Sequence, residues 1–458
     1  MGQLNNCGQA QMVRLPFHIL ASGRSDTLTV NRFWMLLGAA AVVGLFARLY
    51  YVLVVVRGKI TLSGDAETYF LLGKRLATGG GYVRAREAID IPTAEFPPVY
   101  PLLLGALDFV GLTSATGQRL FGVLIGVGTV VVIGLLGSAV AGRTVGVVAA
   151  FIAALYPQLI TFDGTLMSEG LFAALISVTL LGAVRAMDPS EKAPTKWWVL
   201  ASVSTGIGIL TRTEALLLLP FILIPGAVFA SAQAGSLAAR SRRALLVCAG
   251  SAVALSLWTV RNARALGRFQ PFTNNSGTAL SGANCDAVYK GPQIGGWRLD
   301  CVPEYDSSIM PESDFADEAR QAGMQYISAH LSDLPRVVAA RLARTFGLWD
   351  IRTSLFFEST EGRDYDWLWA GWIAWLLIAA LAVVGVATLR SKGIRFWPLL
   401  MPFAIVALMS VITYGNQRFR AGAEPGLAVL AGVGLVQCTR QIMSLSANRQ
   451  RQQTDGTS

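Results

Sequence analysis

Two carboxylates follow the first long apolar run of the chain, in the stretch SGDAETYF at residues 63–70. A carboxylate at Asp65 has two interpretations. It can accept a proton from a hydroxyl group that attacks a substrate, or it can cap the helix that the pattern AETYFLLGKRLA predicts. Glu67 lies about 200° further around such a helix, so we expect only one of the two to face a given site.

Similar polar residues recur at the predicted outer ends of the other apolar runs. Arginine has a planar fork that binds a phosphate through two hydrogen bonds, and ionisable groups at membrane depth indicate function. Each residue alone also has a structural interpretation: an acidic residue near a helix N-terminus complements the helix dipole, and Arg48, inside the first run, is expected to snorkel. The set comprises Asp65, Glu67, Tyr69, Tyr82, Arg84, Glu95, Asp163, Ser168, Glu169, Arg212, Glu214, Arg261, Asn262, Arg418, Arg420 and Glu424.

The elements that carry these residues follow from composition. The 458 residues are 53% hydrophobic and only 14% charged, where a soluble domain has about a quarter charged residues. Apolar runs of about 20 residues recur and are long enough to cross a bilayer. The chain is therefore predicted to be an all-α polytopic membrane protein. Its net charge of +10 comes from scattered basic residues without a basic stripe, which argues against a nucleic-acid partner.

We expect ten transmembrane helices. Residues 98–113 are also apolar, but they are short and begin with prolines, so we expect them to lie along the membrane surface. With this assignment every cytoplasmic piece carries basic residues, as the positive-inside rule requires, and both termini are cytoplasmic. The expected spans are 33–55, 118–140, 144–160, 166–187, 196–211, 214–232, 243–260, 367–389, 395–413 and 423–438.

The resulting organisation is a membrane domain between two cytoplasmic tails, with two large external segments. The tails are 1–32 and 439–458, the membrane domain is 33–438, and the external segments are 57–117 and 261–366.

The second external segment contains Cys285 and Cys301, which we expect to form a disulfide in an oxidising compartment. The alternative is two free thiols. Residues 313–349 have a helical pattern that Pro335 should divide in two, and the second half is expected to lie on the membrane surface. The chain has two histidines, which argues against a histidine-rich zinc site.

Several of these stretches together resemble the GT-C superfamily of glycosyltransferases, in particular the bacterial members similar to protein O-mannosyltransferases and to the aminoarabinose transferase of lipid A. GDAETYFLLGKRLATGGGY and EFPPVYPLLLGAL resemble the first outer loop, and ALYPQLITFDGTLMSEGLF resembles the second. GIGILTRTEALLLLP resembles a later segment of the family pattern, with Thr213 here in place of the usual proline. WTVRNARALGRF and RFRAGAEPGLAVLAG resemble the last two segments of that pattern. The resemblance covers most of residues 45–435.

The resemblance implies a GT-C fold and an inverting transfer of a hexose or pentose from a polyprenyl-phosphate donor to an acceptor outside the cytoplasm. It places the protein in a bacterial plasma membrane, with the active site on the external side. Asp65 is then the candidate base, and Glu169 is a second catalytic acidic residue. The implied substrate contacts are Glu67, Tyr69, Tyr82, Arg84, Arg212, Arg261, Asn262, Arg418 and Arg420, of which the last two and Arg261 are the main candidates for the donor phosphate.

The resemblance leaves a divalent cation open. Asp65 and Glu169 are the carboxylates that would bind magnesium or manganese through oxygen atoms. Two other functions remain as alternatives. A transporter or lipid flippase would show paired halves and broken helices at the membrane midplane, and no internal repeat is present in the sequence. A scaffold that has lost catalysis would have no need of both Asp65 and Glu169.

Overall fold

The computed structural model describes residues 28–455, apart from 59–60, 88–89, 231–234 and 308–309. Most of the cytoplasmic tail expected at residues 1–32 therefore lies outside the described residues. The described chain is helical, and its one β-type backbone bridge pairs Val83 with Pro92. The longer helices are α1 (Val30–Tyr50), α4 (Ala115–Ala141), α5 (Arg143–Leu155), α7 (Glu169–Ala186), α8 (Pro194–Ile209), α9 (Leu237–Leu266), α15 (Tyr365–Ser391), α16 (Trp397–Ile412) and α17 (Glu424–Asp455).

Shorter helices connect these or cap one end of the bundle. They are α2 (Gly64–Ala77), α3 (Val99–Phe109), α6 (Pro157–Asp163), α10 (Asn275–Gly282), α11 (Asp286–Tyr289), α12 (Glu312–Ala329), α13 (Leu334–Thr345) and α14 (Ile351–Ser359). Tighter or wider helical turns complete the set: η1 (Tyr51–Val56), η2 (Thr213–Leu217), η3 (Leu219–Leu223), η4 (Gly226–Ala230), η5 (Leu299–Cys301) and η6 (Gln417–Gly422).

The predicted all-helical membrane architecture is confirmed, whereas the count of ten spans is not. Among the described residues, six helices are long and apolar enough to cross a membrane, or seven if α5 and α6, bent by 63°, form one span. Every predicted span nevertheless contains at least one helix or helical turn. Helix α3, within the predicted interfacial stretch, has 11 residues and is too short to cross alone. Its position relative to a membrane stays a prediction.

The long helices pack through small residues where their backbones meet. A side-chain Cβ at Gly385 of α15 would lie 1.9 Å from the carbonyl oxygen of Leu430 in α17. A Cβ at Gly434 of α17 would lie equally close to Leu381 of α15. Only glycine therefore fits at either position. Close backbone contact of this kind stabilises helix pairs in a bilayer, where the lipid is as apolar as the side chains.

Arg48 does not snorkel, contrary to expectation. Its side chain is fully buried, and its Nε lies 2.7 Å from Asp163 Oδ2 at the end of α6. It also donates hydrogen bonds to the carbonyl oxygens of Gly44, Ala153 and Ala154. A buried charge needs both a counter-charge and hydrogen-bond acceptors, and this arginine has both inside the helix bundle.

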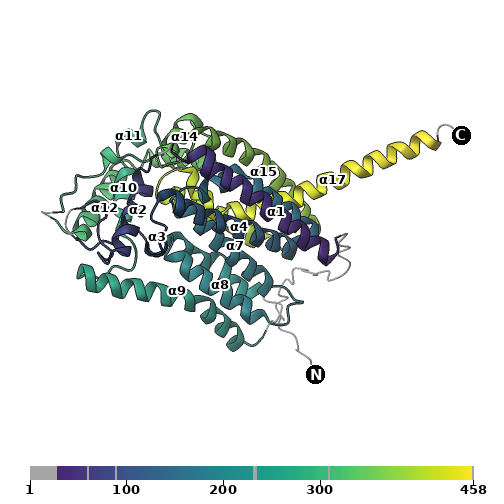
Figure 1. Cartoon of the computed structure of the whole chain (residues 1–458), viewed down its shortest axis with the longest axis horizontal. Helices are drawn as coiled ribbons and strands as arrows, with labels where there is room; N and C mark the ends of the chain where they lie inside the picture. The colour runs from purple at the N-terminus through teal and green to yellow at the C-terminus, as the bar shows by residue number, and fades with distance from the viewer. Residues whose placement is uncertain (1–27, 59–60, 88–89, 231–234, 308–309, 456–458) are drawn as a thin grey trace, which may run out of the picture.

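The helices of the two predicted external segments gather at one end of the molecule, on the left in Figure 1, while α17 extends from the other end. The predicted break at Pro335 is confirmed, because α12 ends at Ala329 and Pro335 lies in the first turn of α13. Arg341 and Arg344 of α13 are buried and donate to protein oxygen atoms. These arginines therefore face the protein, and the position of α13 relative to a membrane stays a prediction. A disulfide joins Cys285 to Cys301 in the same segment.

Candidate active site

Helix α2 carries Asp65 in its first turn. The helix begins at Gly64, whose φ of +58° favours glycine, and its N-cap is Ser63, so the interpretation of Asp65 as the cap is wrong. Two contacts fix this turn: Ser63 Oγ donates to the carbonyl oxygen of Thr360, and Thr68 Oγ1 donates to that of Gly64 at 3.1 Å. The side chain of Asp65 is one-third exposed and therefore remains accessible.

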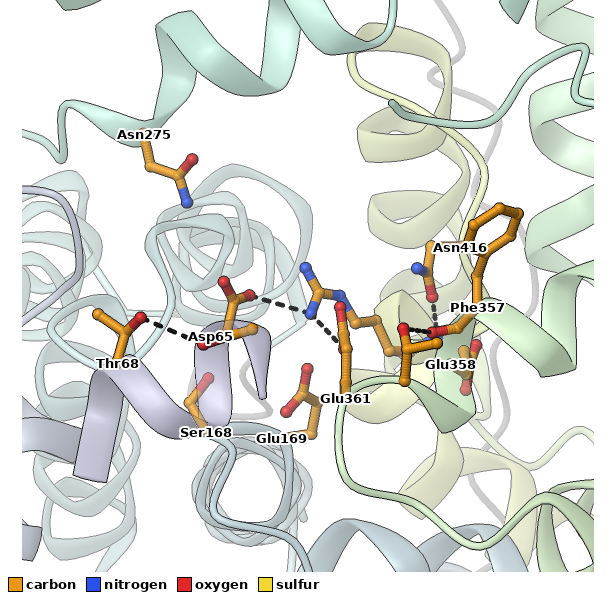
Figure 2. A network of polar contacts seen from close by, with 12 residues as sticks. Asp65, Thr68, Ser168, Glu169, Asn275, Phe357, Glu358, Glu361 and Asn416 are labelled. Atoms are coloured by element: carbon orange, nitrogen blue, oxygen red, sulfur yellow. Dashed lines mark hydrogen bonds and ion pairs between the residues drawn. The ribbon is translucent and has the colours of Figure 1, made fainter. Parts of the chain in front are cut away.

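Arg418 joins Asp65 to a second carboxylate that the sequence did not single out. Its Nη1 lies 3.1 Å from Asp65 Oδ2 and 2.7 Å from Glu361 Oε2. Its Nη2 also donates to the Tyr414 hydroxyl oxygen at 3.1 Å. Figure 2 shows Asp65 and Glu361 on the two sides of this guanidinium group. A single arginine thus pairs with two carboxylates that come from distant parts of the chain.

Glu361 lies in the loop between α14 and α15, next to the start of α2. Burial raises the pKa of its carboxyl group above the usual value, and the charge of Arg418 opposes this shift. The stretch FFESTEGRDYDW, which includes Glu361, contains four glutamate or aspartate residues just before the apolar run at 367–389. Polar residues gather at the predicted outer ends of the spans, and this pattern would have identified Glu361 from the sequence.

Glu169 has a different environment from Asp65. Its side chain is fully buried at the start of α7, where Oε1 accepts a hydrogen bond from Arg212 Nη1 at 3.1 Å. Oε2 lies 3.7 Å from Nη2 of Arg363, which also pairs with Glu358 at 3.0 Å. Glu169 lines neither of the cavities described below. It holds two arginines in place behind the surface that carries Asp65.

The carboxylates do not fit the divalent cation that the resemblance left open. A shared cation would require Asp65 and Glu169 to turn free oxygen atoms toward one point. Asp65 faces Arg418 instead, and Glu169 faces Arg212 and Arg363. Within the part of the chain that the structure describes, no group of three or more His, Cys, Asp or Glu side chains is arranged to hold a metal ion. Arginine side chains provide the positive charge at this site.

Two cavities meet at Asp65 and Arg418. The inner cavity has a volume of about 190 Å³ and lies between α7, η2 and α16, with Phe172, Ile176 and Ile405 among its apolar lining residues. The outer cavity has a volume of about 820 Å³ and is lined mainly by loops and helices of the two predicted external segments. The residues that line both cavities are Asp65, Glu95, Asn275, Ala279, Tyr414 and Arg418. We call these six residues the shared wall.

Glu95 is a second carboxylate on the shared wall. Burial raises its pKa to about 7, while the positive charge of Arg84 lowers it. Its backbone N–H donates to Thr93 Oγ1 at 3.0 Å, which fixes the residue at the start of the Pro97–Pro98 pair. The carboxyl group therefore changes its charge closer to neutral pH than an exposed glutamate does, and it lines both cavities.

Several predicted substrate-binding residues instead brace the loops around the site. Arg261 donates to the carbonyl oxygens of Thr93 and Tyr82, and the Tyr82 hydroxyl donates to that of Phe96. The Asn262 side-chain amide donates to the carbonyl oxygen of Gln270. Ion pairs join Arg84 to Glu312 and Glu67 to Arg86.

Glu312 fastens this loop to α12, and the sequence did not identify it. Its carboxylate accepts hydrogen bonds from Thr93, Asn274 and the backbone of Ala94 at 2.6–2.9 Å. Tyr69 and Arg212 do line the inner cavity, as a substrate contact requires.

Arg420 does not lie with Arg418. Its side chain is fully buried, its Nε lies 3.3 Å from Glu424 Oε1, and its guanidinium carbon lies 4.5 Å from the centre of the Trp375 ring. It lines neither cavity. The structure therefore offers Arg418, and not Arg420, to a ligand in the inner cavity.

Comparisons with known proteins agree with this architecture. The family model described as dolichyl-phosphate-mannose-protein mannosyltransferase matches residues 95–259, which is less than half of the chain. A search of curated proteins finds no significant match. The predicted resemblance to the GT-C superfamily is confirmed by the family model and the fold.

Among solved structures, the apo oligosaccharyltransferase of Archaeoglobus fulgidus superposes with a TM-score of 0.50 at 14% identity, over 91% of this chain and 52% of that one. The same protein in complex with zinc and sulfate superposes with a TM-score of 0.50 at 15% identity, over 89% of this chain and 49% of that one. ArnT from Cupriavidus metallidurans, bound to undecaprenyl phosphate, superposes with a TM-score of 0.43 at 15% identity, over 89% of this chain and 78% of that one. The chain spans about half the length of the oligosaccharyltransferase, and at 14–15% identity the likeness to that protein establishes the fold alone.

Proposed function

We propose that this protein is a membrane glycosyltransferase that moves a sugar from a polyprenyl-phosphate donor to an acceptor hydroxyl on the external face of the plasma membrane. The observation that carries the proposal is the Asp65–Arg418 pair on the wall between two cavities of different character. The name of the matching family model, which specifies a lipid-phosphate-linked sugar donor, supports the same reaction class.

The inner cavity suits the donor. Apolar side chains of α7 and α16 line it, including Phe172, Ile176 and Ile405, so the first isoprene units have contacts within the bundle. Arg418 lies on the shared wall and Arg212 also lines this cavity. Their guanidinium groups can bind the phosphate with charge-assisted hydrogen bonds. The donor sugar then points toward the outer cavity.

The outer cavity suits the acceptor, because it is formed by the external segments and reaches Asp65. In the proposed step the acceptor oxygen bonds to the anomeric carbon as the bond from that carbon to the phosphate oxygen breaks. The hydroxyl proton passes to Asp65, and the electron pair leaves with polyprenyl phosphate. Arg418 stabilises the negative charge on the leaving phosphate. One displacement of this kind inverts the anomeric configuration.

The ion pair also links donor binding to base activation. A carboxylate paired with arginine is a weak base, because the positive charge favours its ionised form. A donor phosphate that binds Arg418 competes with Asp65 for the same guanidinium group. The donor phosphate thus releases Asp65 from this ion pair, which limits proton abstraction to the complex with donor.

The proposal is tested by incubating the purified full-length protein in lipid nanodiscs with a panel of polyprenyl-phosphate sugars and a mixture of extracytoplasmic glycans and peptides. We expect release of polyprenyl phosphate together with a glycosylated acceptor. The main alternative, a lipid flippase, would move the donor between leaflets of a vesicle with its sugar–phosphate bond intact. Movement without cleavage of any donor in the panel would contradict the proposal.

A further inference from the structure

The outer cavity contains a large aromatic ring that is both exposed and firmly held. Trp297 is 36% exposed and lines this cavity. Its indole Nε1 donates to the carbonyl oxygen of Thr278 at 3.0 Å. The ring also lies against Gly282, where an added Cβ would be 2.2 Å from Nε1. The ring therefore keeps a fixed orientation without being covered by protein.

The disulfide contributes to this fixed orientation. Cys285 and Cys301 close a loop that contains Trp297, and the loop is tied to α10 by a hydrogen bond from Arg298 N to the Gly282 carbonyl oxygen at 2.9 Å. Within the loop, Arg298 pairs with Asp300 and donates to Gln293. A rigid aromatic ring at a cavity surface is prepared for a ligand, because little conformational entropy is lost on binding.

Trp297 is also close to the reacting groups. Its ring centre lies 6.3 Å from that of Tyr414, and the Tyr414 hydroxyl accepts a hydrogen bond from Arg418. Arg418 in turn contacts Asp65. A ligand ring stacked on Trp297 would therefore lie beside the shared wall, where the attacking hydroxyl must be placed. Phe357, 45% exposed, provides a second aromatic surface of the same cavity.

The charged residues of the outer cavity are mostly neutralised by each other. Seven of its nine charged lining side chains form ion pairs: Arg84 with Glu312, Arg86 with Glu67, Arg344 with Asp350, Glu358 with Arg363, and Arg418 with both Asp65 and Glu361. Amide side chains such as Asn275 and Asn416 also line the cavity. In Figure 2 Asn275 points into the open space beside Asp65. Such a lining favours a neutral, hydroxyl-rich ligand over a strongly charged one.

We infer that the acceptor is a neutral glycan, and that Trp297 is the surface on which one of its sugar rings stacks. The inference rests on the proposed function, which it completes with a substrate class. The apolar C–H face of a pyranose ring packs on an aromatic ring, while its hydroxyl groups bond to amides and carboxylates. A peptide that binds by adding a strand to a sheet would instead need an exposed strand edge. In the described residues, the β-type pairing is limited to Val83 and Pro92.

Binding to the donor-free protein tests the inference separately from catalysis. The full-length protein in nanodiscs is titrated by calorimetry with neutral manno-, gluco- and galacto-oligosaccharides of two to four residues, and with a serine- and threonine-containing peptide. We expect at least one oligosaccharide to bind, and Trp297→Ala to weaken its binding about tenfold. Trp297→Phe should retain part of the affinity. Trp349→Ala is the matched control, because Trp349 is exposed in the same external segment but does not line the cavity.

Undecaprenyl phosphate binding by the same variants should equal that of the unmodified protein, because Trp297 does not line the inner cavity. If Trp297→Ala does not fold, Phe357→Ala replaces it, with the same expected loss. The inference is overturned if no oligosaccharide binds, if only the peptide binds, or if the folded aromatic variants bind the oligosaccharide as tightly as the unmodified protein. Oligosaccharide binding without any donor cleavage would instead overturn the proposed reaction.

Discussion

Arg418 Nη1 lies 3.1 Å from Asp65 Oδ2, although the two residues are 353 positions apart in the chain. The contact joins the first external segment to the segment that precedes the last helix, and it stands on the wall between the two cavities. Both groups have roles in the proposed reaction, one as the base and one as the ligand of the phosphate.

Arg418→Ala should weaken the binding of undecaprenyl phosphate by tenfold or more, on the order of 1.5–3 kcal/mol for a charged hydrogen bond. Arg418→Lys should restore only part of this affinity, because lysine lacks the planar fork. Calorimetry on nanodisc-embedded protein measures both effects. Arg86→Ala is the control, since it removes an exposed ion pair with Glu67. Donor affinity that is unchanged in Arg418→Ala would show that the phosphate binds elsewhere.

The raised pKa of Glu95 predicts a pH-dependent stability. Its carboxyl group has a pKa of about 7 in the folded protein and about 4.5 otherwise. Between these values the folded protein holds a proton that the unfolded chain does not, so unfolding releases a proton and stability falls as pH rises from 4.5 to 7. Glu95→Gln should reduce this fall. Thermal unfolding at pH 5 and pH 8 measures this loss of stability. An equal loss in the Glu95→Gln variant and the unmodified protein would refute the raised pKa of Glu95.

The buried Arg48–Asp163 pair predicts an asymmetric effect of mutation. Arg48→Met leaves the Asp163 carboxylate buried without its partner, which costs roughly 3–5 kcal/mol. The double variant Arg48→Met, Asp163→Leu removes both charges and should be more stable than the single variant. Thermal unfolding of both proteins in one detergent provides the comparison. A double variant that is the less stable of the two would mean that the pair stabilises the bundle beyond its charge balance.

Cysteine labelling tests the predicted membrane topology. Single cysteines at Ala115 and Gln293 in a chain with its native cysteines replaced by serine should both react with an impermeant reagent added from outside intact cells. The prediction follows from the positive-inside rule, and it places α3 on the external side without crossing. Labelling at residue 115 only after the membrane is opened would contradict this arrangement.

Periodicity and run length predicted the helices well, because a bilayer imposes a fixed length of apolar chain. Contacts between distant segments were not predictable in the same way. Arg48 was expected to snorkel because its partner, Asp163, is 115 positions away. Glu361 was missed for the same reason, since its role depends on Arg418, 57 positions further on.

Arg418 and Arg420 show a further limit of prediction from sequence. Both match the same motif, and both were expected to bind the phosphate. They lie in a 3₁₀ turn, where residues two positions apart point in different directions. One consequently faces the cavities while the other is buried against Trp375 and Glu424. The roles of Asp65, Glu169 and Arg418 in catalysis remain predictions.

The most direct test of the account is the turnover of Asp65→Asn. Asparagine keeps the size of the side chain and can still hydrogen-bond, but it cannot take a proton from the acceptor. We expect transfer from the active donor to fall by roughly 10²-fold or more, with undecaprenyl phosphate binding and thermal stability nearly unchanged. Glu67→Gln, on the other side of the same helix, should have a much smaller effect. Full transfer activity in a folded Asp65→Asn protein would contradict the assignment of the base.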